Sequence, residues 1–195
     1  MRNIAVFASG YGSNFQSILD YFSDNQFDIV VKLMVTDNPN SYAVERAKKN
    51  DIEYFAFNPK DYKFKHNYEE IIIDKLSKYE IDLIVLAGYM RIIGRSILSC
   101  FPNKIINVHP SLLPSFKGKD AIGQAISAKA DVTGVTVHFV NEFLDSGEII
   151  IQESLDISNL KKREDIEEKI HEIEHRLLPQ AIIKTMEEIN EKSID

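Results

Sequence analysis

The sequence predicts an α/β fold with a mostly parallel central sheet flanked by helices. Short apolar runs alternate along the chain with segments whose apolar residues recur every three or four positions, the pattern of repeated strand and helix units. The run at 83–87 is apolar at every position, as expected for a strand covered on both faces of a parallel sheet. Glycines and polar residues follow several of these runs, at the end of the strand where α/β proteins bind ligands.

The individual elements follow from apolar spacing and from the turn residues between them. Strands are predicted over residues 4–8, 28–36, 52–57, 83–87, 105–108, 135–140 and 149–151. Helical spacing is seen over residues 15–22, 43–49, 68–79, 121–130 and 166–177. The alternation in 135–140 indicates a half-buried strand, and we expect Pro179 to break or restart the last helix.

Composition bounds the kinds of partner that the protein can have. The 195 residues fit one domain, 1–195, and 44% hydrophobic content is enough for a sizeable core. A net charge of −7 argues against a general nucleic-acid coat and against binding to an anionic membrane surface. No apolar run is long enough to span a bilayer or to form a signal peptide, so we expect a cytoplasmic protein that acts on small molecules, as a monomer or a homodimer. Cys100 is the only cysteine, which excludes an internal disulfide, and we expect it to be a packed side chain.

The clearest candidate site lies at the carboxyl end of the run at 105–108 and in the loop that follows it. Asn107 and His109 are two positions apart, so in an extended chain their side chains share a face. Pro110 restricts His109 to extended geometry and limits how far its imidazole can move. An amide donor and an imidazole directed at one small volume indicate a functional site rather than a part of the hydrophobic core.

A second candidate is the glycine loop at 9–14, Ser-Gly-Tyr-Gly-Ser-Asn, between the first strand and the first helix. The amides at a helix start can bind a phosphate, and Ser13 with Gln16 has the spacing of a capping box. From spacing alone, a phosphate site and an ordinary tight turn are equal alternatives.

Several charged residues have a plain structural reading beside a functional one. Arg91, among apolar residues after a strand, either extends to solvent or recognises an anion. Lys65 belongs to a basic helix start that is usually solvated, Asp145 is a lone loop aspartate of the kind that forms turns, and Glu174 is normally a solvated helix residue. The five histidines show no metal-ligand spacing, so no metal is expected.

Two segments carry a family resemblance. They are Asn-Val-His-Pro-Ser-Leu-Leu-Pro at 107–114, followed by Gly118, and Gly-Val-Thr-Val-His-Phe-Val at 134–140, followed by Asp-Ser-Gly at 145–147. With them, residues 1–183 resemble the folate-dependent formyltransferases, most closely the branch that acts on glycinamide ribonucleotide. The resemblance implies a Rossmann-like formyltransferase fold. It also implies transfer of the formyl group of 10-formyltetrahydrofolate, as co-substrate, to the amine of N1-(5-phospho-D-ribosyl)glycinamide in purine biosynthesis.

The resemblance also implies roles for single residues. Gly12, Ser13 and Asn14 match the loop that holds the ribose phosphate, and Glu174 matches the residue that holds the glycinamide end. The folate is expected near 90–93 and 140–145, with the residues Lys65, Met90, Arg91, Ile92, Ile93 and Asn107. The family commonly has an arginine in contact with the folate where this chain has Lys65, so this position departs from the pattern.

Formyl transfer passes through a tetrahedral intermediate that bears an oxyanion. Asn107 supplies an amide N–H for the oxyanion, a contact worth on the order of 3 kcal/mol in comparable sites. His109 is the expected proton carrier, and Asp145 against it would favour the imidazolium that donates the proton. His138 either supports the site or is a hydrogen-bonded structural residue.

Three other functions compete with this interpretation. A methionyl-tRNA formyltransferase usually adds a basic carboxyl-terminal domain, which an acidic chain of 195 residues does not suggest. A formyltetrahydrofolate deformylase usually carries an extra amino-terminal domain, and the glycine loop with Asn14 favours a phosphorylated acceptor over water. A ligand-binding module on the same scaffold is the non-enzymatic alternative. The presence of Asn107, His109 and Asp145 together argues against it, because a binding module does not need all three catalytic groups.

Overall fold

The structure is a computed structural model that describes residues 1–23, 27–160 and 162–191. The chain divides into two compact units, Met1–Ile106 and Asn107–Asp195, and each is described by itself. The expectation of one domain over 1–195 stays a prediction.

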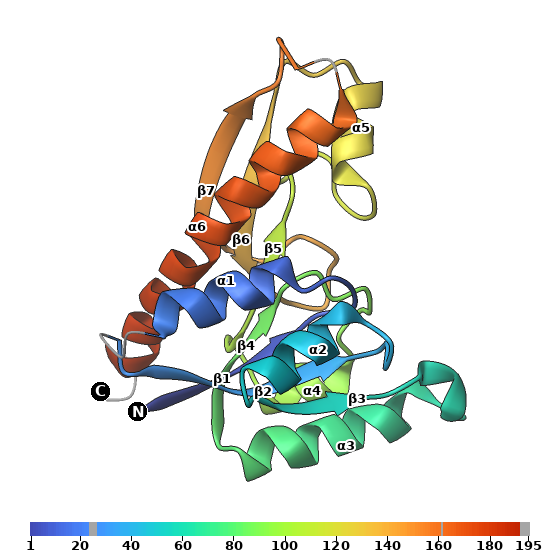
Figure 1. The fold of residues 1–195 in the computed structure, drawn as a ribbon, viewed down its shortest axis with the longest axis vertical. Coiled ribbons are helices and arrows are strands. Elements are labelled where there is room, and N and C mark those ends of the chain that lie inside the picture. The colour runs from blue at the N-terminus through green and yellow to red at the C-terminus, as the bar shows by residue number, and fades with distance from the viewer. Residues whose placement is uncertain (24–26, 161, 192–195) are drawn as a thin grey trace. The chain divides into compact units, whose positions relative to one another are not determined.

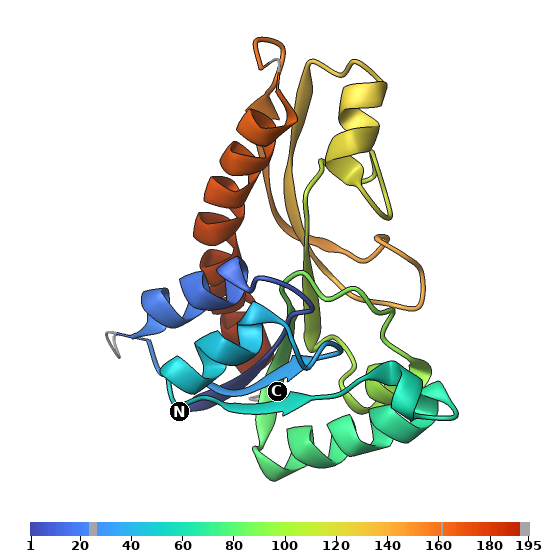
Figure 2. The same cartoon turned by 45° about the vertical axis from the view of Figure 1, so that its right-hand side comes forward.

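The first unit is built on parallel strands with helices on both sides. β1 (Arg2–Phe7) pairs with β2 (Ile29–Thr36) and with β4 (Ile81–Leu86), and β2 pairs with β3 (Glu53–Ala56). The helices are α1 (Ser13–Phe22), α2 (Tyr42–Lys49), α3 (Lys65–Lys78) and α4 (Arg95–Cys100), with the 3-10 turn η1 (Pro59–Asp61). Figures 1 and 2 show α1 and α2 on one side of these strands and α3 on the other.

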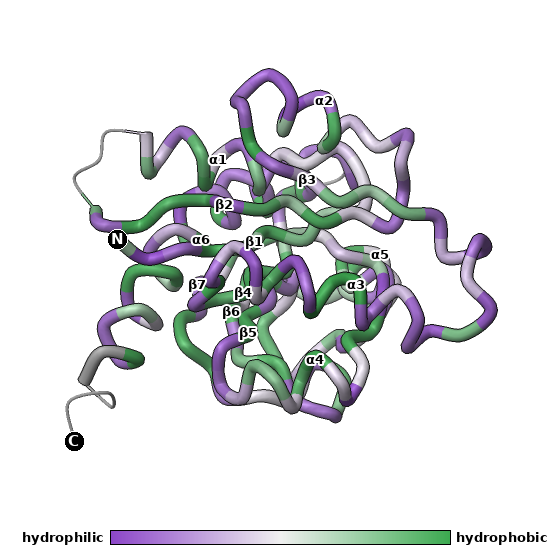
Figure 3. The backbone as a smooth tube through the Cα atoms, turned by 90° about the horizontal axis from the view of Figure 1, so that it is seen from below, coloured by the Kyte–Doolittle hydropathy of each residue, from purple (hydrophilic) through white to green (hydrophobic). Residues whose placement is uncertain are grey.

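Burial in the first unit follows from this layering. Ile4, Ala5, Val6 and Phe7 of β1 are all fully buried, because β1 is paired on both edges and covered on both faces. In Figure 3, most of β2 is green, the colour of hydrophobic residues. The parallel, doubly covered sheet that the apolar runs predict is therefore confirmed.

The second unit holds an antiparallel pair and the longest helix. β6 (Val132–Phe139) pairs antiparallel with β7 (Ile149–Asp156), and α6 (Arg163–Glu191) packs on both strands, as Figure 1 shows. α5 (Ala121–Ser127) contacts β6 and α6. β5 (Ile105–His109) starts in the first unit and ends in the second, and the strand order is β3-β2-β1-β4-β5-β6-β7.

Three expectations are wrong in their details. β6 is not half-buried, because it has a strand on each side and helices packed against it, so Val135 and Thr136 are both buried. Pro179 lies inside a continuous α6. Proline removes one helical hydrogen bond, but buried residues before and after it, Leu178 and Ala181 among them, keep both halves packed. Cys100 is exposed at the end of α4 rather than packed.

Among the residues that the structure describes, no helix combines the length and the apolar character that crossing a membrane requires.

Candidate functional site

The end of β5 positions the two residues on which the sequence analysis centres. Ile105, Ile106 and Val108 are buried and fix the strand, and His109 is its last residue. His109 is only 5% exposed, so its imidazole is held within the second unit rather than in solvent. Asn107 is partly buried two positions before it on the same strand.

Asp145 lies beside His109, as the motif match implied. It belongs to the loop between β6 and β7, is 9% exposed and has a left-handed backbone with φ of 47°. Its Oδ2 is 3.6 Å from Nδ1 of His109 and accepts a 2.8 Å hydrogen bond from the amide of Gly118. The carboxylate is thus placed to stabilise a positive charge on the His109 ring.

His138 on β6 joins the same cluster and has a defined tautomer. Its Nδ1 is 2.8 Å from the carbonyl of Phe139, and because a carbonyl only accepts, Nδ1 carries the proton. Burial lowers the pKa of His138, so the ring is neutral at pH 7 and Nε2 accepts. The donor is the side-chain amide of Asn107, 3.2 Å away, which means that His138 orients Asn107. Nε2 of His138 is also 3.8 Å from Oδ1 of Asp145.

The segment that follows β5 covers the other side of His109. Nε2 of His109 donates to the carbonyl of Phe116 at 2.9 Å. Together with the hydrogen bond from Gly118 to Asp145, this contact ties both predicted catalytic groups to the loop before α5. A ligand that reaches His109 through Nε2 must therefore displace the carbonyl of Phe116.

In the first unit, the glycine loop leads into α1 with an open helix start. Gly12 precedes the helix in a left-handed conformation with φ of 72°, and a Cβ there would lie 3.0 Å from Cβ of Ala43. Ser13 is the first residue of α1, not its cap, so the predicted capping box is wrong. Gln16 instead accepts from Arg46 and donates to Asp20. The first turn has no acidic residue, which leaves its amides suited to an anion.

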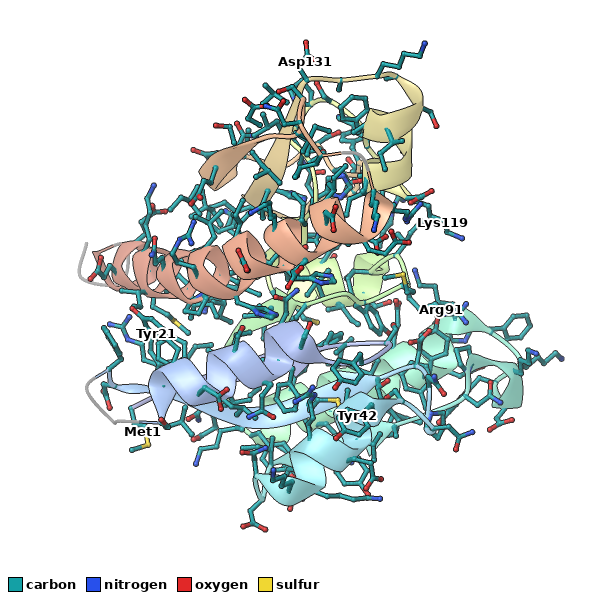
Figure 4. All side chains as sticks on the ribbon, turned by 45° about the horizontal axis from the view of Figure 1, so that its top comes forward. Met1, Tyr21, Tyr42, Arg91, Lys119 and Asp131 are labelled. Carbon is teal, nitrogen blue, oxygen red and sulfur yellow. The ribbon has the colours of Figure 1, made fainter. Side chains whose placement is uncertain are left out.

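Arg46 of α2 holds this loop in place. Its Nε donates to the carbonyl of Tyr11 at 2.9 Å, and Nη1 donates to Oε1 of Gln16 at 3.1 Å. The guanidinium lies over the rings of Tyr11 and Tyr42, with centroid distances of 4.6 and 5.0 Å, and those two rings stack on each other. Tyr42, at the start of α2, is labelled in Figure 4.

The loop at 88–94, after β4, lies directly beside the glycine loop. The amide of Met90 donates to Oγ of Ser9 at 2.8 Å, and the amide of Ser9 donates to the carbonyl of Gly88 at 3.1 Å. Met90 and Ile92 are 68% and 70% exposed, whereas Ile93 is buried. The loop therefore presents two apolar side chains outward from a backbone that the glycine loop holds, where they are free to contact a ligand.

Arg91 reaches solvent, one of the two alternatives that the sequence left open, since its side chain is 47% exposed. Its Nε donates to Oδ2 of Asp37 at 2.8 Å, so the guanidinium is paired within the unit. The hydrogen bond raises the pKa of Arg91, which stays charged. Figure 4 labels Arg91. Beside it, burial raises the pKa of Tyr89, whose ring packs edge-on against Phe7.

Lys65 starts α3 and is 43% exposed, as expected for a solvated helix start, but its ammonium also has partners. Its Nζ donates to the carbonyl of Ile92 at 2.6 Å and lies 3.5 Å from Oε1 of Glu69 one turn along α3. Glu69 is 4% exposed and also accepts from the amide of Gly94 at 2.8 Å.

Glu174 of α6 is 6% exposed, so the reading of it as a solvated residue is wrong. The residues predicted for the ribonucleotide fall in both units, Gly12, Ser13 and Asn14 in the first and Glu174 in the second. Those predicted for the folate do likewise, with 90–93 in the first unit and 140–145 in the second. Among the described residues, no group of three or more His, Cys, Asp or Glu side chains is arranged to hold a metal ion.

The sequence of the chain matches a known protein family. Residues 2–182 match the model of the formyl transferase family. The chain belongs to the formyl transferase family. It is 45% identical to the phosphoribosylglycinamide formyltransferase of Bacillus subtilis, over 98% of each chain. It is 34% identical to the human trifunctional purine biosynthetic protein adenosine-3, over 92% of this chain and 18% of that one.

Solved structures agree with the assignment to the formyl transferase family. Glycinamide ribonucleotide transformylase 1 from Geobacillus kaustophilus superposes with a TM-score of 0.90 at 47% identity, covering 93% of this chain and 96% of that chain. Phosphoribosylglycinamide formyltransferase from Bacillus halodurans gives 0.89 at 43% identity, covering 92% and 93%. The family that the motifs at 107–114 and 134–147 predict is confirmed.

Sequence reasoning missed three residues that shape the sites of this formyl transferase. Asp37 directly follows the carboxyl end of β2, the edge of the sheet at which α/β proteins bind ligands, and this position was its signal. Glu69 stands four residues after Lys65, the spacing at which helical side chains pair. Arg46 gave no sequence signal, because its partners lie 30 and 35 residues away in the chain.

Proposed function

We propose that this formyl transferase moves the formyl group of 10-formyltetrahydrofolate to the amine of N1-(5-phospho-D-ribosyl)glycinamide, giving the N-formyl ribonucleotide and tetrahydrofolate in purine biosynthesis. The observation that carries the choice of acceptor is the 45% identity, over 98% of each chain, with a protein named phosphoribosylglycinamide formyltransferase. The same proposal has the protein act in the cytoplasm, as a monomer or a homodimer.

The glycine loop supports binding of the ribonucleotide's phosphate. The backbone amides of Gly12, Ser13 and Asn14 stand at the start of α1, where the helix dipole favours an anion. The loop is held by Arg46 before any ligand arrives, so little backbone ordering is left to oppose binding. In the second unit, the buried Glu174 is the proposed partner of the glycinamide end.

The loop at 88–94 supports binding of the folate's pterin ring. Met90 and Ile92 offer exposed apolar side chains, and the backbone of Arg91 and Ile93 offers the amide and carbonyl groups that a pterin edge requires. The pairing of Arg91 with Asp37 keeps the guanidinium from folding over this backbone. Lys65 belongs to the folate side of the site through the Ile92 carbonyl that it binds.

Formyl transfer itself needs stabilisation of an oxyanion, and the proposed donor is Asn107. The amide nitrogen of Asn107 carries two hydrogens, of which one is donated to His138. The second hydrogen is the one proposed to meet the oxyanion that forms when the amine attacks the formyl carbon. Because the first hydrogen bond fixes the amide plane, this donor is oriented before the reaction, which is what makes such a contact effective.

His109 is the proposed proton carrier, with Asp145 as its partner. The carboxylate at 3.6 Å from Nδ1 stabilises the imidazolium, and Nε2, now bonded to Phe116, is the nitrogen that would face the substrates once that carbonyl is displaced. The imidazolium donates a proton toward the oxyanion or the leaving nitrogen of the folate, and the attacking amine loses a proton through water. The amine nitrogen of the ribonucleotide first bonds to the formyl carbon of the folate, which gives the tetrahedral intermediate. The bond from that carbon to the folate nitrogen then breaks, and the folate nitrogen keeps the donated proton.

The test is to identify the acceptor directly. The protein is incubated with a 10-formylfolate analogue and, in separate reactions, with glycinamide ribonucleotide, with charged initiator methionyl-tRNA, or with neither. Gain of one formyl group by the ribonucleotide alone, seen by mass spectrometry, is the expected result. Formyl-methionyl-tRNA, or equal release of formate with no acceptor, would replace the proposal by the tRNA enzyme or the deformylase, and no reaction at all would favour a binding module.

A further inference from the structure

The loop at 88–94 rests on a charged pair that the formyl-transfer chemistry does not use. Glu69 and Lys65 stand one turn apart on α3, and each binds the loop at a different backbone group. Lys65 donates to the carbonyl of Ile92 at 2.6 Å, while Glu69 accepts from the amide of Gly94 at 2.8 Å. The two side chains are 3.5 Å from each other, so they form one connected bridge between helix and loop.

The position of Glu69 is unusual for an acidic residue. Its side chain is 5% exposed, although a carboxylate is costly to bury without partners. Gly94 is fitted against it, because a Cβ at Gly94 would lie 2.1 Å from Oε2 of Glu69 and 2.5 Å from Oε1. The close approach leaves room only for glycine, and the loop and the carboxylate are therefore shaped to each other.

We propose that Glu69 and Lys65 are positioning residues for the folate co-substrate, which set its affinity by fixing the backbone of 92–94 and do not contact it. The inference rests on the proposed function for the identity of that ligand. It replaces the expected contact of Lys65 with the folate by an indirect role, since the ammonium that would reach a folate carboxylate is already bound to Ile92 and Glu69.

The physical reason is preorganisation of the loop. Ile92 is 70% exposed and Ile93 is buried, so the two successive side chains point to opposite sides of the loop only while its backbone keeps this conformation. Without the bridge, the carbonyl of Ile92 and the amide of Gly94 lose their partners, and the loop samples other conformations that binding must then remove. Because the loop at 88–94 is the proposed folate loop, the affinity for the folate decreases and the affinity for the ribonucleotide does not.

The experiment separates positioning from direct contact by changing the ligand. The variants are Glu69→Gln, Glu69→Ala, Lys65→Met and Lys65→Arg, with Glu70→Gln as the matched control, an exposed carboxylate one residue along α3. For each, KM is measured for the 10-formylfolate analogue, for the corresponding 10-formylpteroate, which lacks the glutamate, and for the ribonucleotide. Unfolding temperatures are recorded in parallel.

We expect Lys65→Met and Glu69→Ala to raise KM about 10-fold for both one-carbon donors alike, with kcat and the KM of the ribonucleotide unchanged. Lys65→Arg keeps the KM of both donors close to the wild-type value, because a guanidinium also donates to the Ile92 carbonyl. The control Glu70→Gln behaves as wild type. Glu69→Gln, which keeps the volume and an acceptor for Gly94, gives an intermediate loss and serves if Glu69→Ala does not fold.

Three results would overturn the proposal. A loss confined to the glutamate-bearing donor means that Lys65 contacts the folate carboxylate directly. Equal increases in KM for donor and ribonucleotide, with a lowered unfolding temperature, mean a purely structural role, and unchanged KM values mean no role. If the wild-type protein does not formylate the ribonucleotide at all, the proposed function fails, and equilibrium binding of the two donors to the same variants still decides the role of the bridge.

Discussion

The side-chain amide of Asn107 donates a hydrogen bond to Nε2 of His138, 3.2 Å away, and through it a buried neutral histidine sets the plane of the proposed oxyanion donor. His138 can play this part only as the Nδ1 tautomer, which the carbonyl of Phe139 enforces at 2.8 Å. The two residues come from β5 and β6, which the sheet places next to each other in the second unit.

Removing the amide of Asn107 tests its assigned role. Asn107→Ala is expected to lower kcat about 100-fold to 1000-fold, as for other oxyanion donors, because the lost hydrogen bond forms fully only with the charged intermediate. Initial rates at saturating substrates measure the effect. Asn159→Ala, an exposed asparagine of the same unit, is the control and keeps full activity. A value of kcat within about 3-fold of wild type for Asn107→Ala would remove the amide from the mechanism.

Burial of a neutral His138 predicts a pH dependence of stability. Because burial lowers the pKa of His138 in the folded state, the unfolded chain binds the proton more readily. The stability that the neutral ring contributes is complete above its unfolded pKa of about 6.5 and is lost as the pH falls from there through the folded-state pKa.

Urea unfolding on both sides of that range, for wild type and His138→Gln, measures the contribution. The unfolding free energy of wild type should fall more steeply on acidification than that of the variant. His66→Gln, which removes an exposed histidine, should keep the slope of wild type. Equal slopes for wild type and His138→Gln would show that the folded protein protonates His138 as easily as the unfolded chain does.

Because Arg46 holds the glycine loop in place, its removal should selectively lower the affinity for the phosphorylated acceptor. Arg46→Ala frees the carbonyl of Tyr11 and the side chain of Gln16, so the glycine loop loses its fixed shape. We expect KM for the ribonucleotide to rise about 10-fold, which corresponds to 1.4 kcal/mol, with KM for the folate unchanged. Arg46→Lys should recover little, because an ammonium cannot make the two-pronged contact.

Steady-state kinetics in both substrates checks this, together with competition by inorganic phosphate, which should weaken in parallel. Lys49→Ala, an exposed cation on the same helix, is the control. A rise in KM of the same size for both substrates would mean that Arg46 serves general stability and has no specific link to the phosphate loop.

Much of the fold was predictable because its signals are local. The fully apolar run at 83–87 overlaps β4, which begins two residues earlier and ends one residue earlier. The stripe of Ile166, Ile170, Ile173 and Leu177 is buried on α6 as its spacing indicates. Pro179 misled the prediction because the local rule on proline takes no account of tertiary packing, which here continues on both sides of it. The alternation at 135–140 misled it because a strand inside the sheet buries its polar residues too when they find partners, as Thr136 does with Ser111 and Gln152.

The candidate site was predictable only where residues stand close in sequence or carry a motif. Asn107 and His109 share a strand, and their pairing on one face follows from a period of two. Asp145 came from the motif, since a distance of 36 residues from His109 leaves no local signal. The contacts of Arg91 with Asp37 and of Lys65 with Ile92 required the structure, because the partners lie 54 and 27 residues apart in the chain.

The most direct test of the account is the turnover number of His109→Asn, measured with both substrates saturating and compared with wild type, with Asp145→Asn in parallel. If His109 carries the proton and Asp145 stabilises its charged form, both variants lose about 100-fold or more in kcat, while the dissociation constant of a folate analogue changes by less than about 2-fold. A His109→Asn protein that turns over near the wild-type rate would contradict the assignment of the proton carrier and, with it, the central claim about this site.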